Sequence, residues 1–174
     1  MLPTGAFAFS SALEAAVQTG VVRDVPTLQQ YVTAALRQSS TGDAVGLAFA
    51  LRALCADPVS AGGAPAEATL ARLRNIDLAL YRRKLPEEFR DMMTKTGRRL
   101  TELGARTTGT PLMSRWRSQI ESGSTPGSYP VALAVLFSSL SFAEAPIRRA
   151  DGEEEDVLLE EALTVYFYGV AMGI

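Results

Sequence analysis

The sequence contains no histidine, so it lacks the side chain that most often acts as a general base and as a transition-metal ligand. A serine or cysteine nucleophile activated by an imidazole is therefore excluded. A single cysteine and scattered carboxylates make a poor cage for zinc or nickel. We expect no catalytic residue, no tightly held metal and no cofactor.

Cysteine is almost as scarce, since Cys55 stands alone inside an apolar run. One cysteine excludes a disulfide framework and fits a reducing compartment, so we expect a cytoplasmic protein. The N-terminus has no basic segment followed by an apolar core, and no signal peptide is expected. The longest apolar stretch, residues 129–142, is too short to span a bilayer, so we expect no membrane partner.

An excess of positive charge is also missing, because 17 lysines and arginines face 19 aspartates and glutamates, a net charge of −2. No global basic field would recruit nucleic acid, and we expect no nucleic-acid partner. The 174 residues, 47% of them hydrophobic, suffice for one domain with a core.

Strand patterns are scarce, since no segment alternates apolar and polar residues over a useful length. Helical apolar spacing instead recurs along the chain. These patterns cover residues 9–17, 28–36, 43–54, 70–80, 89–103, 111–120, 129–142 and 157–174. We predict an all-α fold, a single-domain bundle of about seven to eight helices over residues 1–174.

Some helices carry sharper expectations. Asp24 with Pro26 predicts a helix start, and Pro86 predicts a break between two helices. The helix that begins at Asp43 is apolar all round, which is typical of a buried central helix. The helix over 89–103 is expected to carry one mainly apolar face and to end at Gly104. The residues predicted to share this face are Phe89, Met92, Thr96, Leu100 and Leu103.

The first fourteen residues form the least generic stretch of the chain. The residues concerned are Leu2, Pro3, Gly5, Phe7, Phe9, Ser10, Leu13 and Glu14. From the residues alone, this is a turn followed by a first helix whose apolar stripe runs from Phe9 to Val17 and which ends at Gly20. The pattern, followed by Gly20-Val21, resembles the opening signature of the UreF family of urease accessory proteins.

Two later segments extend this resemblance over nearly the whole chain. Gly97-Arg98-Arg99-Leu100 is similar to a mid-chain Gly-Arg-x-Leu element of the family, and residues 166–169 are similar to its aromatic late helix. The sequence departs from the family at Ala12, where glycine is usual, and at Tyr129, near a position that usually carries histidine. A final Pro-Leu-Gly-Gln element is absent, so we expect the family's C-terminal tail to be missing from residues 1–174.

The resemblance implies a UreF-like fold and a non-enzymatic chaperone role in nickel insertion. Family members bridge a nickel-carrying GTPase, UreG, and a second accessory protein, UreD or UreH, which docks on apo-urease. A homodimer is also implied, and the widely distributed apolar residues of the last helix favour one. The residues expected to bind or support partners are Phe7, Phe9, Ser10, Leu13, Glu14, Arg98 and Tyr168.

Several alternatives stay open. The basic segment from Arg82 to Arg99 is ordinary surface charge, a contact with an acidic partner, or the source of an arginine finger for a GTPase. A helical sensor domain with an apolar pocket near Trp116 and Phe137 is the competing function. An enzyme using carboxylates alone needs two of them facing each other across a cleft, which no spacing in the sequence demands.

Overall fold

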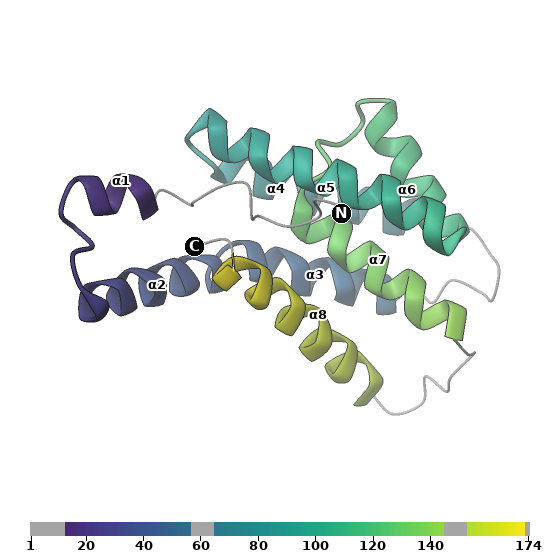
Figure 1. The fold of residues 1–174 in the computed structure, drawn as a ribbon. Coiled ribbons are helices and arrows are strands. Elements are labelled where there is room, and N and C mark those ends of the chain that lie inside the picture. The colour runs from purple at the N-terminus through teal and green to yellow at the C-terminus, as the bar shows by residue number, and fades with distance from the viewer. Residues whose placement is uncertain (1–12, 57–64, 145–152, 173–174) are drawn as a thin grey trace.

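The computed structural model describes residues 13–56, 65–144 and 153–172, and these residues form helices joined by short connections (Figure 1). The helices are α1 Leu13–Gln18, α2 Val25–Ser40, α3 Asp43–Ala56, α4 Glu67–Arg83, α5 Glu87–Thr108, α6 Pro111–Glu121, α7 Tyr129–Glu144 and α8 Glu153–Met172. Within these three ranges there is no strand. The all-α prediction is therefore confirmed.

Helix boundaries follow local chemistry. The Asp24 carboxylate accepts a 2.9 Å hydrogen bond from the Thr27 backbone N–H, and the Asp24 N–H donates to the Thr27 hydroxyl at 3.1 Å. This reciprocal capping starts α2 with Pro26 in its first turn, as predicted. Pro86 stands between α4 and α5, which confirms the predicted break.

The core is built around α7, which packs against α3, α5, α6 and α8. Figure 1 shows α7 running between the group of α4, α5 and α6 and the last helix, α8. Val131 and Val135 of α7 meet Leu47 and Leu51 of α3 in one buried cluster. Trp116 of α6 is also fully buried there. A helix apolar on most sides, such as α7, belongs at the centre because each of its faces needs cover.

Helix α3 differs from the prediction. Its Leu47, Leu51 and Leu54 are buried, but Val45 and Phe49 are 39% and 56% exposed. The helix is apolar all round in sequence, yet its described neighbours cover only part of it. Helix α1 also differs from its predicted apolar stripe, because Ala16 is buried whereas Val17 is exposed.

The buried face of α5 lies about one residue further along the chain than the predicted face, although Leu100 of that predicted face is partly buried against the core. The buried residues are Met93, Thr94, Gly97, Thr101 and Gly104, and Phe89 is 41% exposed. Glycine is present at position 97 because the backbone of residues 127–129 comes too close for a side chain. Gly104 lies inside the helix against Met113 and Leu136. The helix ends instead at Gly109, whose φ of 62° is a left-handed cap that favours glycine.

Helix α2 lies at the edge of the fold and has no fully buried residue. It packs against α8 and α3, and Figure 1 shows it extending away from α4, α5 and α6. In the described ranges, no helix combines the length and apolar character that crossing a bilayer requires. The Gly- and Pro-rich segment 59–65 is predicted from the sequence to be a flexible loop, and residues 59–64 of it lie outside the described residues.

Candidate functional site

The residues expected to contact partners fall on separate parts of the fold. Leu13 and Glu14 begin α1, where Leu13 is half-buried and Glu14 is exposed. Arg98 lies on the surface of α5, and Tyr168 of α8 is 64% exposed. Helices α1, α5 and α8 do not pack extensively on one another within the described residues. The structure therefore does not gather these four residues into one site.

Three further expected residues, Phe7, Phe9 and Ser10, lie outside the described residues. Their predicted role in partner contact stays a prediction. So does the domain prediction over residues 1–174.

Arg98 is exposed, and it also holds the loop between α6 and α7 in place. Its Nε donates a 2.9 Å hydrogen bond to the carbonyl oxygen of Pro126, in the loop between α6 and α7. The preceding residue, Gly97, lies directly against the same loop, and a Cβ there would overlap the Gly127 carbonyl oxygen and the Ser128 backbone. The Gly-Arg pair thus lets α5 approach the loop and then holds it.

A buried carboxylate holds the same loop from the other side. Asp77 of α4 has no exposed surface, and its oxygens accept hydrogen bonds from the Thr125 hydroxyl at 2.6 Å and from the Gly127 and Ser128 N–H groups at 2.7 Å. Sequence reasoning placed Asp77 on the apolar stripe of its helix but gave it no role. A lone carboxylate between buried apolar positions was the available signal, because burying a charge requires several donors.

A second polar contact fixes α8. Tyr166 is buried against Asp43 and Ser39, and its ring lies 6.2 Å from that of Tyr129. Burial raises the pKa of Tyr166 strongly, and the charge of Asp43 raises it further. A hydrogen bond with Ser39 lowers this pKa by less, and smaller contributions from the Asp43 hydrogen bond and from Tyr129 raise it. Lys84 pairs with the same Asp43 carboxylate at 2.7 Å. Residues of α2, α3 and α8, together with Lys84 directly after α4, thus meet in one polar cluster.

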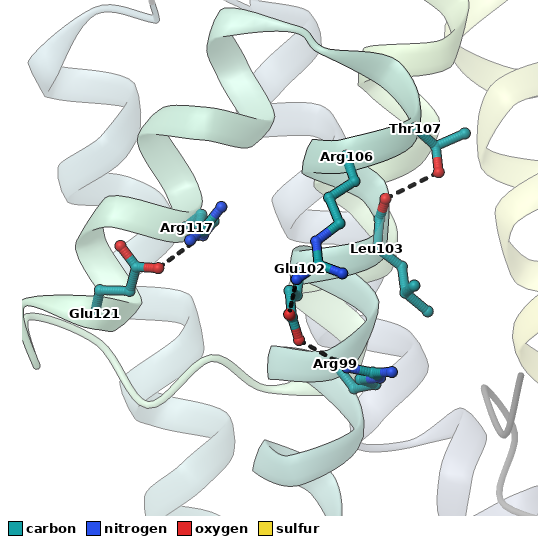
Figure 2. Close-up of polar contacts among 7 residues, drawn as sticks. All are labelled: Arg99, Glu102, Leu103, Arg106, Thr107, Arg117 and Glu121. Atoms are coloured by element: carbon teal, nitrogen blue, oxygen red, sulfur yellow. Dashed lines mark hydrogen bonds and ion pairs between the residues drawn. The ribbon is translucent and has the colours of Figure 1, made fainter.

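Arginines gather on the outer surface of α5 and α6 (Figure 2). Glu102 accepts from Arg99 at 2.9 Å and from Arg106 at 2.6 Å, and Glu121 accepts from Arg117 at 2.7 Å. The Arg99 hydrogen bond, followed by the charge of Arg106, lowers the pKa of Glu102, and the charge of Arg117 adds to this. The three arginines therefore share one patch although they come from two helices.

Helix α8 has two different sides. Ala162 and Tyr166 are buried against the core, whereas Val157, Val165 and Tyr168 are 56%, 44% and 64% exposed. Apolar side chains this exposed on a helix that also packs on a core are typical of a surface that a further protein covers.

The described part of the chain offers little support for a metal site or for an apolar ligand pocket near Trp116. No three metal-ligating side chains lie together among the described residues. Trp116, expected near a ligand pocket, is fully packed, and an open groove of about 650 Å³ lies instead along α2. This groove is lined by Pro26, Gln29, Gln30, Thr33, Ala34 and Arg37.

The described residues thus define an all-α protein in which the buried side chains of Asp77 and Tyr166 link separate helices and the α6–α7 loop. The UreF family model matches residues 22–150. The chain is 38% identical over all 174 residues to the urease accessory protein UreF of Yersinia enterocolitica (serotype O:8 / biotype 1B) and 37% identical to that of Yersinia pestis (strain Pestoides F). This chain belongs to the UreF family.

The chain spans 65% of the length of each of these two relatives. No solved structure matches it. The resemblance noted in the sequence is confirmed, although the family match itself begins after the opening signature of residues 2–14.

Proposed function

We propose that this chain is a non-enzymatic scaffold in the maturation of the urease nickel centre. It holds the UreG-type GTPase and the UreD/UreH-type accessory protein in one complex, through which both reach apo-urease. The observation that carries the proposal is the UreF match over residues 22–150. Nickel is the cargo of this process and needs no resident site in the scaffold.

The chemistry of the buried polar groups supports a scaffold. The Asp77 carboxylate is saturated by three donors from the α6–α7 loop, and Asp43 is engaged by Lys84 and Tyr166. A general base needs a free oxygen within reach of a substrate proton. These carboxylates are used instead to fix helices, which suits a protein that works by presenting surfaces.

The second accessory protein is proposed to bind the N-terminal segment, through Phe7, Phe9, Ser10, Leu13 and Glu14. The test is a double variant, Phe7→Ala with Phe9→Ala, co-purified with the UreD/UreH-type protein. We expect binding to be lost while the helical circular dichroism is unchanged. Phe89→Ala removes a half-exposed phenylalanine from α5 and serves as the control. Retained binding by the double variant would refute this contact.

The GTPase is proposed to contact Arg98. Because Nε of Arg98 is bonded to Pro126, its two terminal amino groups stay available to a partner. Arg98→Ala should weaken capture of the GTPase, with a thermal shift measured alongside to separate loss of contact from loosening of the loop. If Arg98 acts as an arginine finger, GTP hydrolysis in the complex falls as well. Unchanged capture would remove Arg98 from the interface.

A homodimer is proposed through the outer side of α8, with Tyr168 among its contacts. Val165→Asp places a charge within that apolar surface and should convert a dimer to a monomer in multi-angle light scattering. Ser118→Asp is the control, because it adds the same charge at an exposed position of α6, which does not pack extensively on α8 within the described residues. A wild-type chain that stays monomeric over a wide concentration range would contradict the proposal.

A further inference from the structure

We infer that the arginine face, formed by Arg98, Arg99 and Arg106 of α5 and Arg117 of α6, docks a carboxylate-rich surface of a partner protein. The inference rests on the proposed function in one respect, since the partner is sought among the urease-maturation proteins. The contact with Arg98 proposed above concerns one residue, whereas this surface extends across two helices.

The geometry of the face is fixed by two glutamates. Glu102 lies between Arg99 and Arg106, one turn away on either side, and bonds both guanidinium groups (Figure 2). On the neighbouring helix, α6, Glu121 accepts a 2.7 Å hydrogen bond from Nε of Arg117. Helices α5 and α6 pack on each other, and Figure 2 shows the Arg117–Glu121 pair on α6 next to the part of α5 that carries Glu102 and Arg106. The Arg117 charge also contributes to the lowered pKa of Glu102.

These contacts leave most of the hydrogen-bonding capacity of the arginines unused. A guanidinium group carries five N–H donors in a planar fork. Arg99 and Arg106 each give one nitrogen to Glu102, and Arg98 gives its Nε to Pro126. The side chains are therefore already oriented, and a partner would find donors in place at a reduced entropic cost.

Stability does not explain this arrangement. The side chains of Arg99, Arg106 and Arg117 are 47%, 66% and 46% exposed. Ion pairs at such exposure contribute little to folding because water and salt screen them. A cluster that adds little to the fold, yet is held in a defined geometry, is suited to recognition.

The charge of the face indicates the chemistry of its partner. Four arginines and the two glutamates give a local charge of +2, in a chain whose net charge is −2. Guanidinium groups match carboxylates through paired hydrogen bonds, and a local basic field speeds encounter with an acidic surface. The glutamates between the arginines disfavour binding of a nucleic-acid backbone, because its phosphates would be repelled by both carboxylates. An acidic protein surface fits better than nucleic acid.

The test compares three single charge reversals in the full chain. Arg99→Glu and Arg117→Glu change the face, whereas Arg23→Glu makes the same change at an exposed position before α2, outside α5 and α6. Affinities for the purified GTPase and for the second accessory protein are measured by biolayer interferometry at low and high salt. We expect both face variants to lose about tenfold or more in affinity for one partner and to show a weaker salt dependence. Arg23→Glu should bind as the wild type does.

Each outcome decides the matter. If the wild type binds its partners and the three variants bind equally well, the inference is overturned while the proposed function stands. If the wild type binds neither protein, the inference and the proposed function are both contradicted. A DNA duplex of random sequence is the third probe, and specific loss of duplex binding in Arg99→Glu would assign the face to phosphate and overturn the inference. Circular dichroism of every variant confirms that the exposed substitutions leave the fold intact.

Discussion

Two regions of the molecule are held together in different ways. In the region of α4 to α7, a buried carboxylate and a glycine contact lock the α6–α7 loop to α4 and α5. In the region of α2 and α8, α2 has no fully buried residue and α8 keeps Val165 and Tyr168 largely exposed. The first region is locked by polar and backbone contacts, although Leu85, Phe89 and Leu140 keep exposed surface. Within the described residues, the second leaves apolar side chains of α8 exposed, and this is the surface that the proposed homodimer would cover.

The largest effect is expected at the centre of the first region. Asp77→Ala strands three buried donors, those of Thr125, Gly127 and Ser128, and should lower the free energy of unfolding by about 3–5 kcal/mol. Urea denaturation followed by circular dichroism measures it. Asn75→Ala, at an exposed position of the same helix, should change little. A small effect of Asp77→Ala would end the distinction between the two regions.

The next effect comes from the close approach at Gly97. Gly97→Ala forces α5 away from the backbone of residues 127–129 and should cost about 1–3 kcal/mol in the same urea measurement. Gly42→Ala is the control, because the nearest atom to a Cβ there, the Gln38 carbonyl oxygen, is 3.5 Å away. If both alanine variants behaved alike, the backbone contact at Gly97 would not be tight.

A smaller effect is expected where α8 meets the rest of the fold. Tyr166→Phe removes the hydroxyl that bonds Asp43 and should cost about 1 kcal/mol at neutral pH. A raised pKa in the folded state means that the stabilisation is complete below the pKa of the unfolded tyrosine, about 10, and is lost as the pH rises above it.

The pH dependence of Tyr166 sharpens the comparison. Between pH 10 and 11, the wild type should lose stability faster than Tyr166→Phe, by at most about 1.4 kcal/mol per pH unit. Thermal melting of both proteins through this range measures the difference. The two proteins differ only in the Tyr166 hydroxyl, so the difference between their profiles reports on that group. Parallel pH profiles would contradict the assigned environment of Tyr166.

The smallest effect on stability is expected at the arginine face. Glu102→Gln removes exposed ion pairs to Arg99 and Arg106, and the unfolding midpoint should not move detectably. Partner affinity, in contrast, should fall, because the arginines lose the group that orients them. A large loss of stability in Glu102→Gln would show that the cluster serves the fold instead of recognition.

Much of the fold could be predicted from local patterns. The helix start at Asp24, the break at Pro86 and the helix start at Tyr129 all lie where the sequence indicated, because each depends on a few neighbouring residues. The buried face of α5 could not be predicted in this way, because the pattern of large apolar residues pointed to Leu100 and Leu103. The contact is made by Gly97 and Gly104, which no rule based on hydrophobicity selects.

The candidate sites divide in the same way. Family signature residues such as Arg98 were visible in the sequence, but the loop that Arg98 holds was not. The basic segment drew attention to Arg99 but not to Arg117, which lies on another helix and shares its patch only after α5 and α6 pack together. The sequence shows Asp77 as a polar residue within an apolar stripe, but it does not show which groups bond to its carboxylate.

By itself, the sequence determined that this protein is helical and belongs among urease accessory proteins, and its lack of histidine argued against imidazole chemistry. Helix periodicity, caps and signature residues are local properties that a single chain displays directly. Only the tertiary structure decided which faces are covered, which carboxylate is buried and which arginines stand together. Those outcomes depend on contacts between residues far apart in the chain, such as Asp77 with Ser128, and no local pattern encodes them.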